Sequence, residues 1–251
     1  MTQKSKSRNH LSILEDKIQL IKMEKGAIYL VGPIKLPVNL YGETVNFQWY
    51  CWLNYEEVTE DFNRLIEKLS SANLAELQQS SVLTYGDFSY GDDALIRMHS
   101  ICHTGDIFGS KRCDCGFQLK QSMKKIVEQG TGALFYIANQ EGRGIGLFSK
   151  SMAYILQEND YDTVEANEAL GFVDDSRDYS NAINVLKALR SKPVTVMTNN
   201  PKKLEALKNA GLLVSGREPL WGNRSEFNEK YLATKVNRSG HIGEEEKSSN
   251  D

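Results

Sequence analysis

Three of the chain's four cysteines, Cys102, Cys113 and Cys115, lie in the short stretch CHTGDIFGSKRCDC. Thiolates are zinc ligands, and two ligands one residue apart require extended or turn backbone between them. Asp114, which separates the last two cysteines, is typical of a turn. Three protein ligands leave the fourth tetrahedral position open for a water molecule, whose pKa zinc lowers to about 7. The spacing therefore indicates a metal site that could activate water.

Two alternatives to an open catalytic site follow from the same residues. A closed structural site would need a fourth protein ligand, for which Cys51, His99 and His103 are the local candidates. Without a metal, the three cysteines would be small buried residues that happen to cluster. Cys51 lies in a run of strand-forming residues, so we expect it to be a buried strand residue outside the site.

Two further segments have compositions that suit phosphate binding. The glycine-rich QEGRGIG (140–146) lies between a predicted strand and a predicted helix, where backbone N–H groups and Arg143 could hold phosphate. It is neither a dinucleotide-binding nor a Walker A motif, and a tight turn explains it as well. In TNNPKK (198–203), lysines stand at a helix start, where the macrodipole disfavours cations. That placement favours an anion site, although an ordinary capped helix also explains the asparagines and the proline.

Two more features permit both a chemical and a structural interpretation. The segment DDSRDY (174–179) gathers three carboxylates around Arg177, which suits general-base chemistry and phosphate binding. A solvated turn with an internal ion pair is the structural alternative. Tyr154 lies inside a predicted amphipathic helix, and its position alone indicates a core residue.

Composition restricts the class of protein. The chain has 251 residues, a net charge of -3, 25% charged and 40% hydrophobic residues, which is the ordinary globular range. The near-neutral charge gives no reason to expect nucleic-acid binding. No apolar run approaches the roughly 20 residues of a membrane helix, and no signal-peptide core follows MTQKSKSRNH. We therefore expect a cytoplasmic protein without membrane or nucleic-acid partners, whose clustered cysteines serve metal binding or catalysis.

The elements that must position these residues alternate between strand and helix. Residues 27–55 are rich in β-branched and aromatic residues and predict a β-meander, with 43–53 as one long strand; 11–26 could be helix or strand. Further strands are predicted at 81–88, 94–102, 132–140 and 192–198, and helices at 60–79, 116–130, 147–160, 180–190 and 199–211. This alternation favours an α/β fold with a more strand-rich N-terminal part.

Five motifs in order resemble those of GTP cyclohydrolase II, which opens the guanine ring of GTP at the start of riboflavin synthesis. They are RMHSICHTGDIFGSKRCDCGFQL (97–119), QEGRGIGL (140–147), YDTVEANEALGF (161–172), DDSRDY (174–179) and TNNPKKLEAL (198–207). The resemblance implies a mixed sheet flanked by helices and a catalytic domain over 81–242. It leaves a divergent N-terminal region over 1–80, with a flexible tail at 1–10, and a disordered tail at 243–251.

The resemblance also implies roles for individual residues. Cys102, Cys113 and Cys115 would bind one zinc ion per subunit. The zinc-bound water would attack C8 of guanine, and this carbon would leave as formate. Asp175 matches the proton acceptor, and Tyr154 a tyrosine needed for ring opening. Arg177 matches a residue proposed to attack the α-phosphorus, although its high pKa makes an electrostatic role easier. The positions that match GTP-binding residues are Arg97, His99, Ser100, Gln118, Glu141, Gly142, Arg143, Thr163, Thr198 and Lys203. A magnesium ion on the triphosphate and a homodimer are expected as well.

The chain departs from the family pattern beside the first cysteine. The family has HSEC where this chain has HSIC, so Ile101 replaces a carboxylate that could hold the guanine edge. The segment YIANQEGR is one residue longer than its family counterpart and lacks an arginine. The leading hypothesis is hydrolysis of GTP to 2,5-diamino-6-(5-phosphoribosylamino)pyrimidin-4(3H)-one, formate and pyrophosphate. The alternatives are an altered purine nucleotide substrate, a formamidopyrimidine product, or a non-catalytic nucleotide-binding module.

Overall fold

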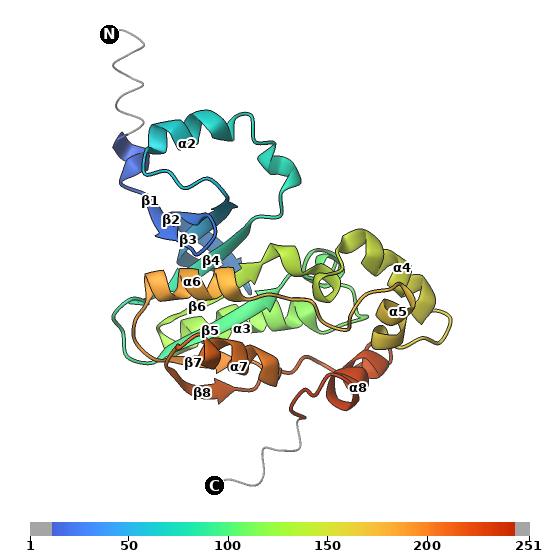
Figure 1. The fold of residues 1–251 in the computed structure, drawn as a ribbon. Helices are drawn as coiled ribbons and strands as arrows, with labels where there is room; N and C mark the ends of the chain where they lie inside the picture. The colour runs from blue at the N-terminus through green and yellow to red at the C-terminus, as the bar shows by residue number, and fades with distance from the viewer. Residues whose placement is uncertain (1–11, 244–251) are drawn as a thin grey trace.

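The computed structural model describes residues 12–243, which form a single eight-stranded sheet with helices on both faces (Figure 1). Strands β1 to β4 and β6 pair antiparallel, whereas β5, β6, β7 and β8 pair parallel. The predicted mixed α/β sheet is therefore confirmed. In spatial order the strands are β1 (Ile18–Lys22), β2 (Ala27–Leu40), β3 (Glu43–Tyr55), β4 (Ser80–Tyr85), β6 (Gly132–Ile137), β5 (Ala94–Ser100), β7 (Val194–Met197) and β8 (Val214–Glu218).

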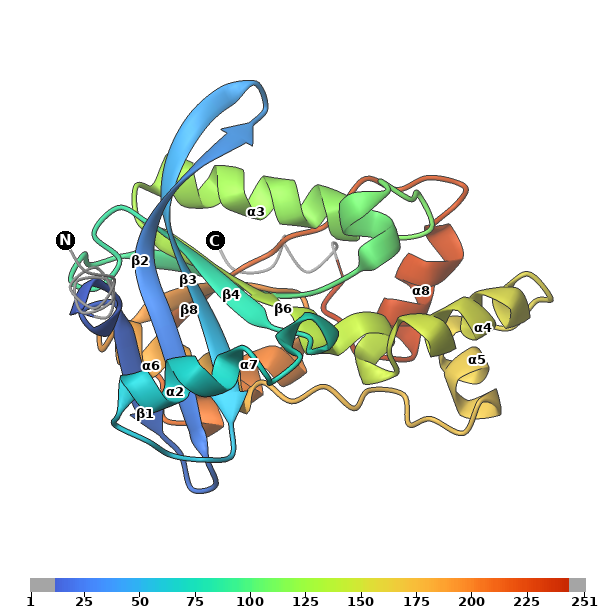
Figure 2. The same cartoon turned by 90° about the horizontal axis from the view of Figure 1, so that it is seen from above.

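The helices cover the two faces of the sheet and one of its ends. Figure 2 shows α3 on one face, α6 and α7 on the other, and α4, α5 and α8 beyond the end where β5 and β6 stop. Core side chains agree, because Ile126 of α3 packs with Leu134, while Leu186 of α6 packs with Phe135 on the opposite face. The helices are α2 (Phe62–Leu69), α3 (Cys115–Gln129), α4 (Leu147–Gln157), α5 (Thr163–Ala169), α6 (Ser180–Leu189), α7 (Pro201–Asn209) and α8 (Glu229–Asn237).

The strand-rich N-terminal part continues the same sheet. The β-branched and aromatic residues of 27–55 form the long hairpin of β2 and β3, as predicted. β3 pairs antiparallel with β4, from Gln48 opposite Thr84 to Trp52 opposite Ser80, so the sheet is continuous across residue 80. Cys51 lies on β3 opposite Ser81; it is half-buried rather than buried, and it lies outside the cysteine cluster.

Several element boundaries differ from the prediction for local reasons. The helix expected over 60–79 is shorter, because α2, capped by Asp61, ends at Leu69 and only a 3-10 turn (Leu74–Glu76) follows. The strand expected over 132–140 ends at Ile137, where a 3-10 segment (Ala138–Gly144) begins. Helices α5 and α8 and strand β8 lie in segments for which no element was predicted.

Two helix termini follow the prediction closely. The Asn200 side chain accepts from the backbone N–H of Lys202 at the start of α7, and Pro201 occupies the first turn. Gly130 ends α3 in the left-handed conformation. The predicted tails, residues 1–10 and 243–251, lie outside the described residues apart from residue 243. Within residues 12–243 no helix has the length and apolar character needed to cross a membrane.

Candidate active site

The sheet topology brings the sequence motifs to one edge. Strands β5, β6 and β7 run parallel, so their carboxyl ends lie at the same edge of the sheet. The cysteine segment follows β5, the glycine-rich segment follows β6, and Thr198 follows β7. Loops beyond the carboxyl ends of parallel strands are the usual position of ligand sites in α/β sheets. Motifs that lie about a hundred residues apart in the chain therefore share one site.

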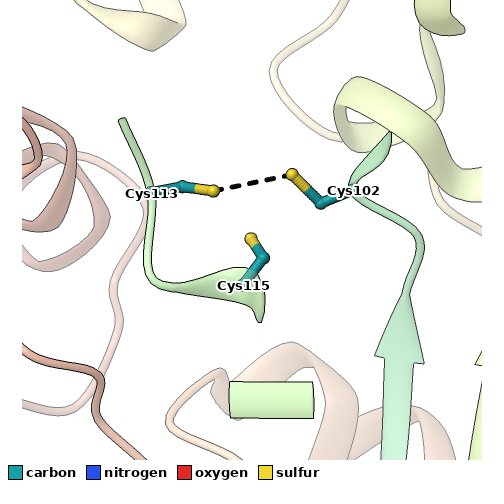
Figure 3. Close-up of side chains that lie close together, drawn as sticks. All are labelled: Cys102, Cys113 and Cys115. Atoms are coloured by element: carbon teal, nitrogen blue, oxygen red, sulfur yellow. Dashed lines mark hydrogen bonds between the residues drawn. The ribbon is translucent and has the colours of Figure 1, made fainter. Parts of the chain in front are cut away.

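The three cysteines form a compact group at this edge (Figure 3). Their sulfur atoms lie within 4.8 Å of one another and turn toward a common centre, and the Sγ atoms of Cys102 and Cys113 are 3.5 Å apart. Cys102 precedes a single π-helical turn (His103–Ile107), and Cys115 is the first residue of α3. Gly105 in that turn faces the sulfurs, because a Cβ atom there would lie 2.8 Å from the Cys113 Sγ.

These sulfurs fit a tetrahedral zinc ion. With Zn–S bonds of about 2.3 Å, tetrahedral ligands lie roughly 3.8 Å apart, which is close to the spacing observed here. No histidine, carboxylate or further cysteine joins the group within residues 12–243, so His99, His103 and Cys51 are not fourth ligands of a closed site. Three thiol ligands and an open position match the catalytic rather than the structural type of zinc site.

The surroundings of the group favour an ionised sulfur. Hydrogen bonds from the Cys113 and Cys115 thiols, together with the charge of Lys150, hold the pKa of Cys102 well below its usual range. The Lys150 Nζ lies 3.2 Å from the Cys102 Sγ. Metal binding requires deprotonated thiols, and this environment favours the ionised form of Cys102.

Two cavities open beside the thiols and meet at four residues. The first, here called the thiol cavity, comprises about 680 Å³ of space, part of which is open to solvent. The second, here called the cation cavity, comprises about 530 Å³, again partly open to solvent. All ten residues predicted to bind substrate line one or both of these cavities, as do Tyr154 and Arg177. The four residues that line both cavities are Ser100, Cys115, Arg177 and Tyr231.

The cation cavity gathers basic side chains whose positions are fixed by hydrogen bonds to backbone carbonyls. Arg97 is anchored by a 2.9 Å hydrogen bond to the Met197 carbonyl, and Lys203 by one of 2.8 Å to the Met98 carbonyl. Burial, reinforced by the charges of Arg97 and Arg177, lowers the pKa of Lys203 well below its ordinary value. Such a cluster suits a polyanionic ligand, which would offset the mutual repulsion of the cations. The predicted substrate-binding residues that line this cavity are Arg97, His99, Ser100, Gln118, Thr198 and Lys203.

The thiol cavity contains the predicted residues of the glycine-rich segment and of α4 and α5. Buried Glu141 accepts a 2.6 Å hydrogen bond from the His103 backbone N–H, which ties the glycine-rich segment to the cysteine segment. Arg143 forms an ion pair with Asp174 and has a left-handed φ of 67°. The predicted substrate-binding residues that line this cavity are Ser100, Glu141, Gly142, Arg143 and Thr163; the three cysteines, Tyr154 and Arg177 line it as well.

Tyr154 lies in the cavity wall and not in the core, contrary to what its helical position alone indicated. Its hydroxyl lies 3.2 Å from the Thr104 Oγ1, which in turn lies 3.8 Å from the Cys102 Sγ. The Arg112 guanidinium covers the ring at 4.0 Å. Burial raises the pKa of Tyr154, so the hydroxyl keeps its proton and can donate it in a hydrogen bond near the sulfurs.

The DDSRDY segment forms an internal ion pair, and that pair lies at the site. The Arg177 Nε donates to the Asp175 Oδ1 at 2.7 Å, and a second guanidinium nitrogen reaches the Oδ2 at 2.5 Å. Although burial acts to raise it, hydrogen bonding to Arg177 holds the pKa of Asp175 below its usual value. Arg177 lines both cavities. Asp175 lines neither of them and lies behind Arg177 as its hydrogen-bond partner.

Several site residues were missed by the sequence analysis. Lys150 is a buried lysine on α4, and Lys235 on α8 is paired at 2.7 Å with Asp114, the residue predicted to form a simple turn. The Tyr231 hydroxyl lies 4.0 Å from the Cys115 Sγ. The segment that carries Tyr231 and Lys235, EKYLATK, overlaps the closing stretch YLATKVNRSGH of the family resemblance, but no role was assigned to either residue there and no helix was predicted. Only the tertiary fold reveals these contacts.

Comparisons with known proteins agree with the geometry. A family model described as GTP cyclohydrolase II matches residues 70–219. GTP cyclohydrolase-2 of Colwellia psychrerythraea is 48% identical over 165 residues, which are 66% of this chain and 81% of that protein. The riboflavin biosynthesis protein RibBA of Bacillus subtilis is 50% identical over 158 residues, which are 62% of this chain but only 39% of that protein. RibBA of Bacillus cereus strain G9842 is 47% identical over 171 residues, and this chain spans 43% of it.

Proposed function

This chain belongs to the GTP cyclohydrolase II family, and we propose that it is a zinc-dependent GTP cyclohydrolase II of riboflavin biosynthesis. In that reaction the imidazole ring of guanine is opened by water. The products are formate, pyrophosphate and 2,5-diamino-6-(5-phosphoribosylamino)pyrimidin-4(3H)-one. The observation that carries the proposal is the junction of a three-thiol group and its cavity with a second cavity lined by cations.

The two cavities divide GTP between them. The triphosphate, with its magnesium ion, binds in the cation cavity, where Arg97, Lys203 and Arg177 offset its charge. The guanine binds in the thiol cavity beside Cys102 and Glu141, which brings C8 toward the sulfurs. The ribose and the α-phosphate then lie at the junction of the two cavities. In this arrangement Arg177 lies between C8, the carbon that reacts with water, and the bond from the α-phosphorus to pyrophosphate, which also breaks.

The residues around the reacting atoms have separable roles. When bound to the three thiolates, a zinc ion supplies the Lewis acidity that water needs to attack C8. The Tyr154 hydroxyl, oriented by Thr104, donates a hydrogen bond to the ring as it opens. Arg177, held by Asp175, stabilises charge at the α-phosphate as pyrophosphate leaves. A water molecule replaces pyrophosphate on the α-phosphorus, and Asp175 accepts the proton of that water once the substrate has drawn Arg177 away.

A second candidate function is favoured by one residue of the thiol cavity. Ile101 lines this cavity where the family resemblance leads us to expect a carboxylate, so it offers no acceptor to the guanine edge. A related purine nucleotide could then be the substrate, or the reaction could stop at a formamidopyrimidine that keeps C8 as a formyl group. Mass spectrometry of the products distinguishes these outcomes, because the stalled product is heavier than the fully hydrolysed one.

The test is incubation of the purified protein with GTP, Mg²⁺ and Zn²⁺. We expect formate and pyrophosphate in equal amounts, and neither product from a Cys113→Ser variant that retains the wild-type circular dichroism spectrum. Binding of GTP without either product would identify a non-catalytic nucleotide-binding module and refute the proposal. From the family resemblance we also propose that the protein is cytoplasmic and forms a homodimer. Sedimentation equilibrium would check the dimer.

A further inference from the structure

A buried lysine on α4 connects the thiol group with a carboxylate of the thiol cavity. Lys150 is 8% exposed, and its Nζ lies 3.2 Å from the Cys102 Sγ and 2.6 Å from the Glu141 Oε1. Glu141 is itself 2% exposed. A buried ammonium group is costly unless it is paired and hydrogen-bonded. The position of Lys150 is therefore strongly determined by these two partners.

The surroundings hold the ammonium group in place. The Glu141 carboxylate is fixed by the backbone N–H groups of His103 at 2.6 Å and Gly142 at 3.1 Å. The Tyr154 ring lies on another side of the Lys150 Nζ, 5.5 Å from it. Lys150 thus contacts the Cys102 sulfur and the Glu141 carboxylate, and that carboxylate is anchored to the cysteine segment and to the glycine-rich segment.

We propose that Lys150 is a positioning residue of the metal centre, an inference that rests on the proposed zinc site. Three thiolates carry one more negative charge than a zinc ion neutralises, and the ammonium group of Lys150 offsets that excess beside Cys102. Its N–H···S hydrogen bond fixes the orientation of the Cys102 thiolate and withdraws electron density from it. A weaker sulfur donor leaves the metal a stronger Lewis acid.

The same lysine connects the metal ligand to a substrate contact. Glu141 lines the thiol cavity and Cys102 binds the metal, and both depend on the position of one ammonium group. A change at Lys150 therefore affects the metal and the nucleotide together. A lysine that only filled space in the core would affect neither of them specifically.

The experiment compares the double variant Lys150→Met/Glu141→Gln with Glu141→Gln, so that the two proteins differ only at residue 150. Lys150→Met alone would leave the Glu141 carboxylate buried without its partner and could unfold the protein. The double variant Lys150→Met/Glu141→Gln leaves no such charge, and Glu141→Gln alone is its matched control. Lys150→Arg, which keeps the positive charge, tests for rescue. Zinc affinity is measured by competition with a chromophoric chelator, and sulfur-to-metal charge transfer by the absorption of the Co²⁺-substituted proteins.

We expect the double variant to bind zinc about 10- to 100-fold more weakly than Glu141→Gln, which is the usual cost of losing an outer-shell partner. Its Co²⁺ charge-transfer band should move to lower energy, because the sulfur lone pair is no longer stabilised by a hydrogen bond. Lys150→Arg should retain most of the wild-type affinity. Equal zinc affinities and an unshifted band would overturn the role of Lys150. Failure of the wild-type protein to bind zinc at all would overturn the zinc site as well.

Discussion

Asp106 in the π-helical turn provides a quantitative test of how the cysteine segment is held. Its side chain is 2% exposed and accepts from three donors. These are the His99 Nε2 at 3.1 Å, the Tyr136 hydroxyl at 3.1 Å and the Cys102 backbone N–H at 2.9 Å. One carboxylate thus joins β5, β6 and the first cysteine. We predict that Asp106→Ala destabilises the protein far more than Asp106→Asn does.

The expected magnitude follows from counting these donors. A buried donor left without a partner costs about 1–3 kcal/mol, so Asp106→Ala should lower the free energy of unfolding by at least about 3 kcal/mol. Asp106→Asn retains one oxygen, which can stay at the Oδ2 position where all three donors converge. It presents an NH₂ group to His99 in place of the second oxygen, and we expect it to cost about 1–2 kcal/mol.

Urea unfolding of the metal-free proteins, followed by circular dichroism, measures both losses. An exposed carboxylate provides the control: Asp92→Ala removes a side chain that is 89% exposed and should unfold at the wild-type urea concentration. Equal unfolding free energies for Asp106→Ala and Asp106→Asn would show that the carboxylate oxygen is not needed by its three donors. That result would mean that water satisfies the three donors when the carboxylate is absent.

Three further predictions concern the metal site and pH. Gly105→Ala should weaken zinc binding at least tenfold, because the added Cβ would push the Cys113 sulfur away. In Gly216→Ala the added Cβ would lie 3.5 Å from its nearest neighbour atom, so this control should bind zinc normally when both are measured by competition with a chromophoric chelator. Burial, with the charge of Lys235 next, lowers the pKa of His241 from 6.5 to about 3. The unfolded chain therefore binds the proton first, stability falls as pH drops below about 6.5, and His241→Gln should make that fall shallower in urea titrations. Chelation of zinc should abolish turnover without loss of helical circular dichroism; concurrent unfolding would indicate a structural metal.

Much of the fold could be predicted from the sequence because its signals are local. The β2–β3 hairpin follows from a run of β-branched and aromatic residues, and the start of α7 from Asn200 and Pro201. The grouping of Cys102, Cys113 and Cys115 also followed from spacing, since their separations are short enough for local closure. These features depend on residues that are close together in the chain, so they can be predicted from the sequence.

The remaining features depend on long-range contacts. α8 was missed because it is held by tertiary partners, such as Asp114, which lies about a hundred residues earlier and pairs with Lys235. α5 begins with a capping box of Asp162 and Glu165, a local signal that the carboxylate-rich composition of its segment obscured. The amphipathic pattern of its helix indicated a core position for Tyr154, whereas the family resemblance assigned it to the site; the structure places it in the wall of the thiol cavity, beside Thr104.

We propose above that this chain removes C8 of guanine as formate at the three-thiol site. GTP labelled with ¹³C at C8, incubated with the zinc-loaded protein and Mg²⁺, tests it in a single NMR sample. We expect the label to appear as free formate while the phosphorus spectrum shows an equal amount of pyrophosphate. Label that remains in intact guanine, or in a formyl group on a pyrimidine product, would contradict it.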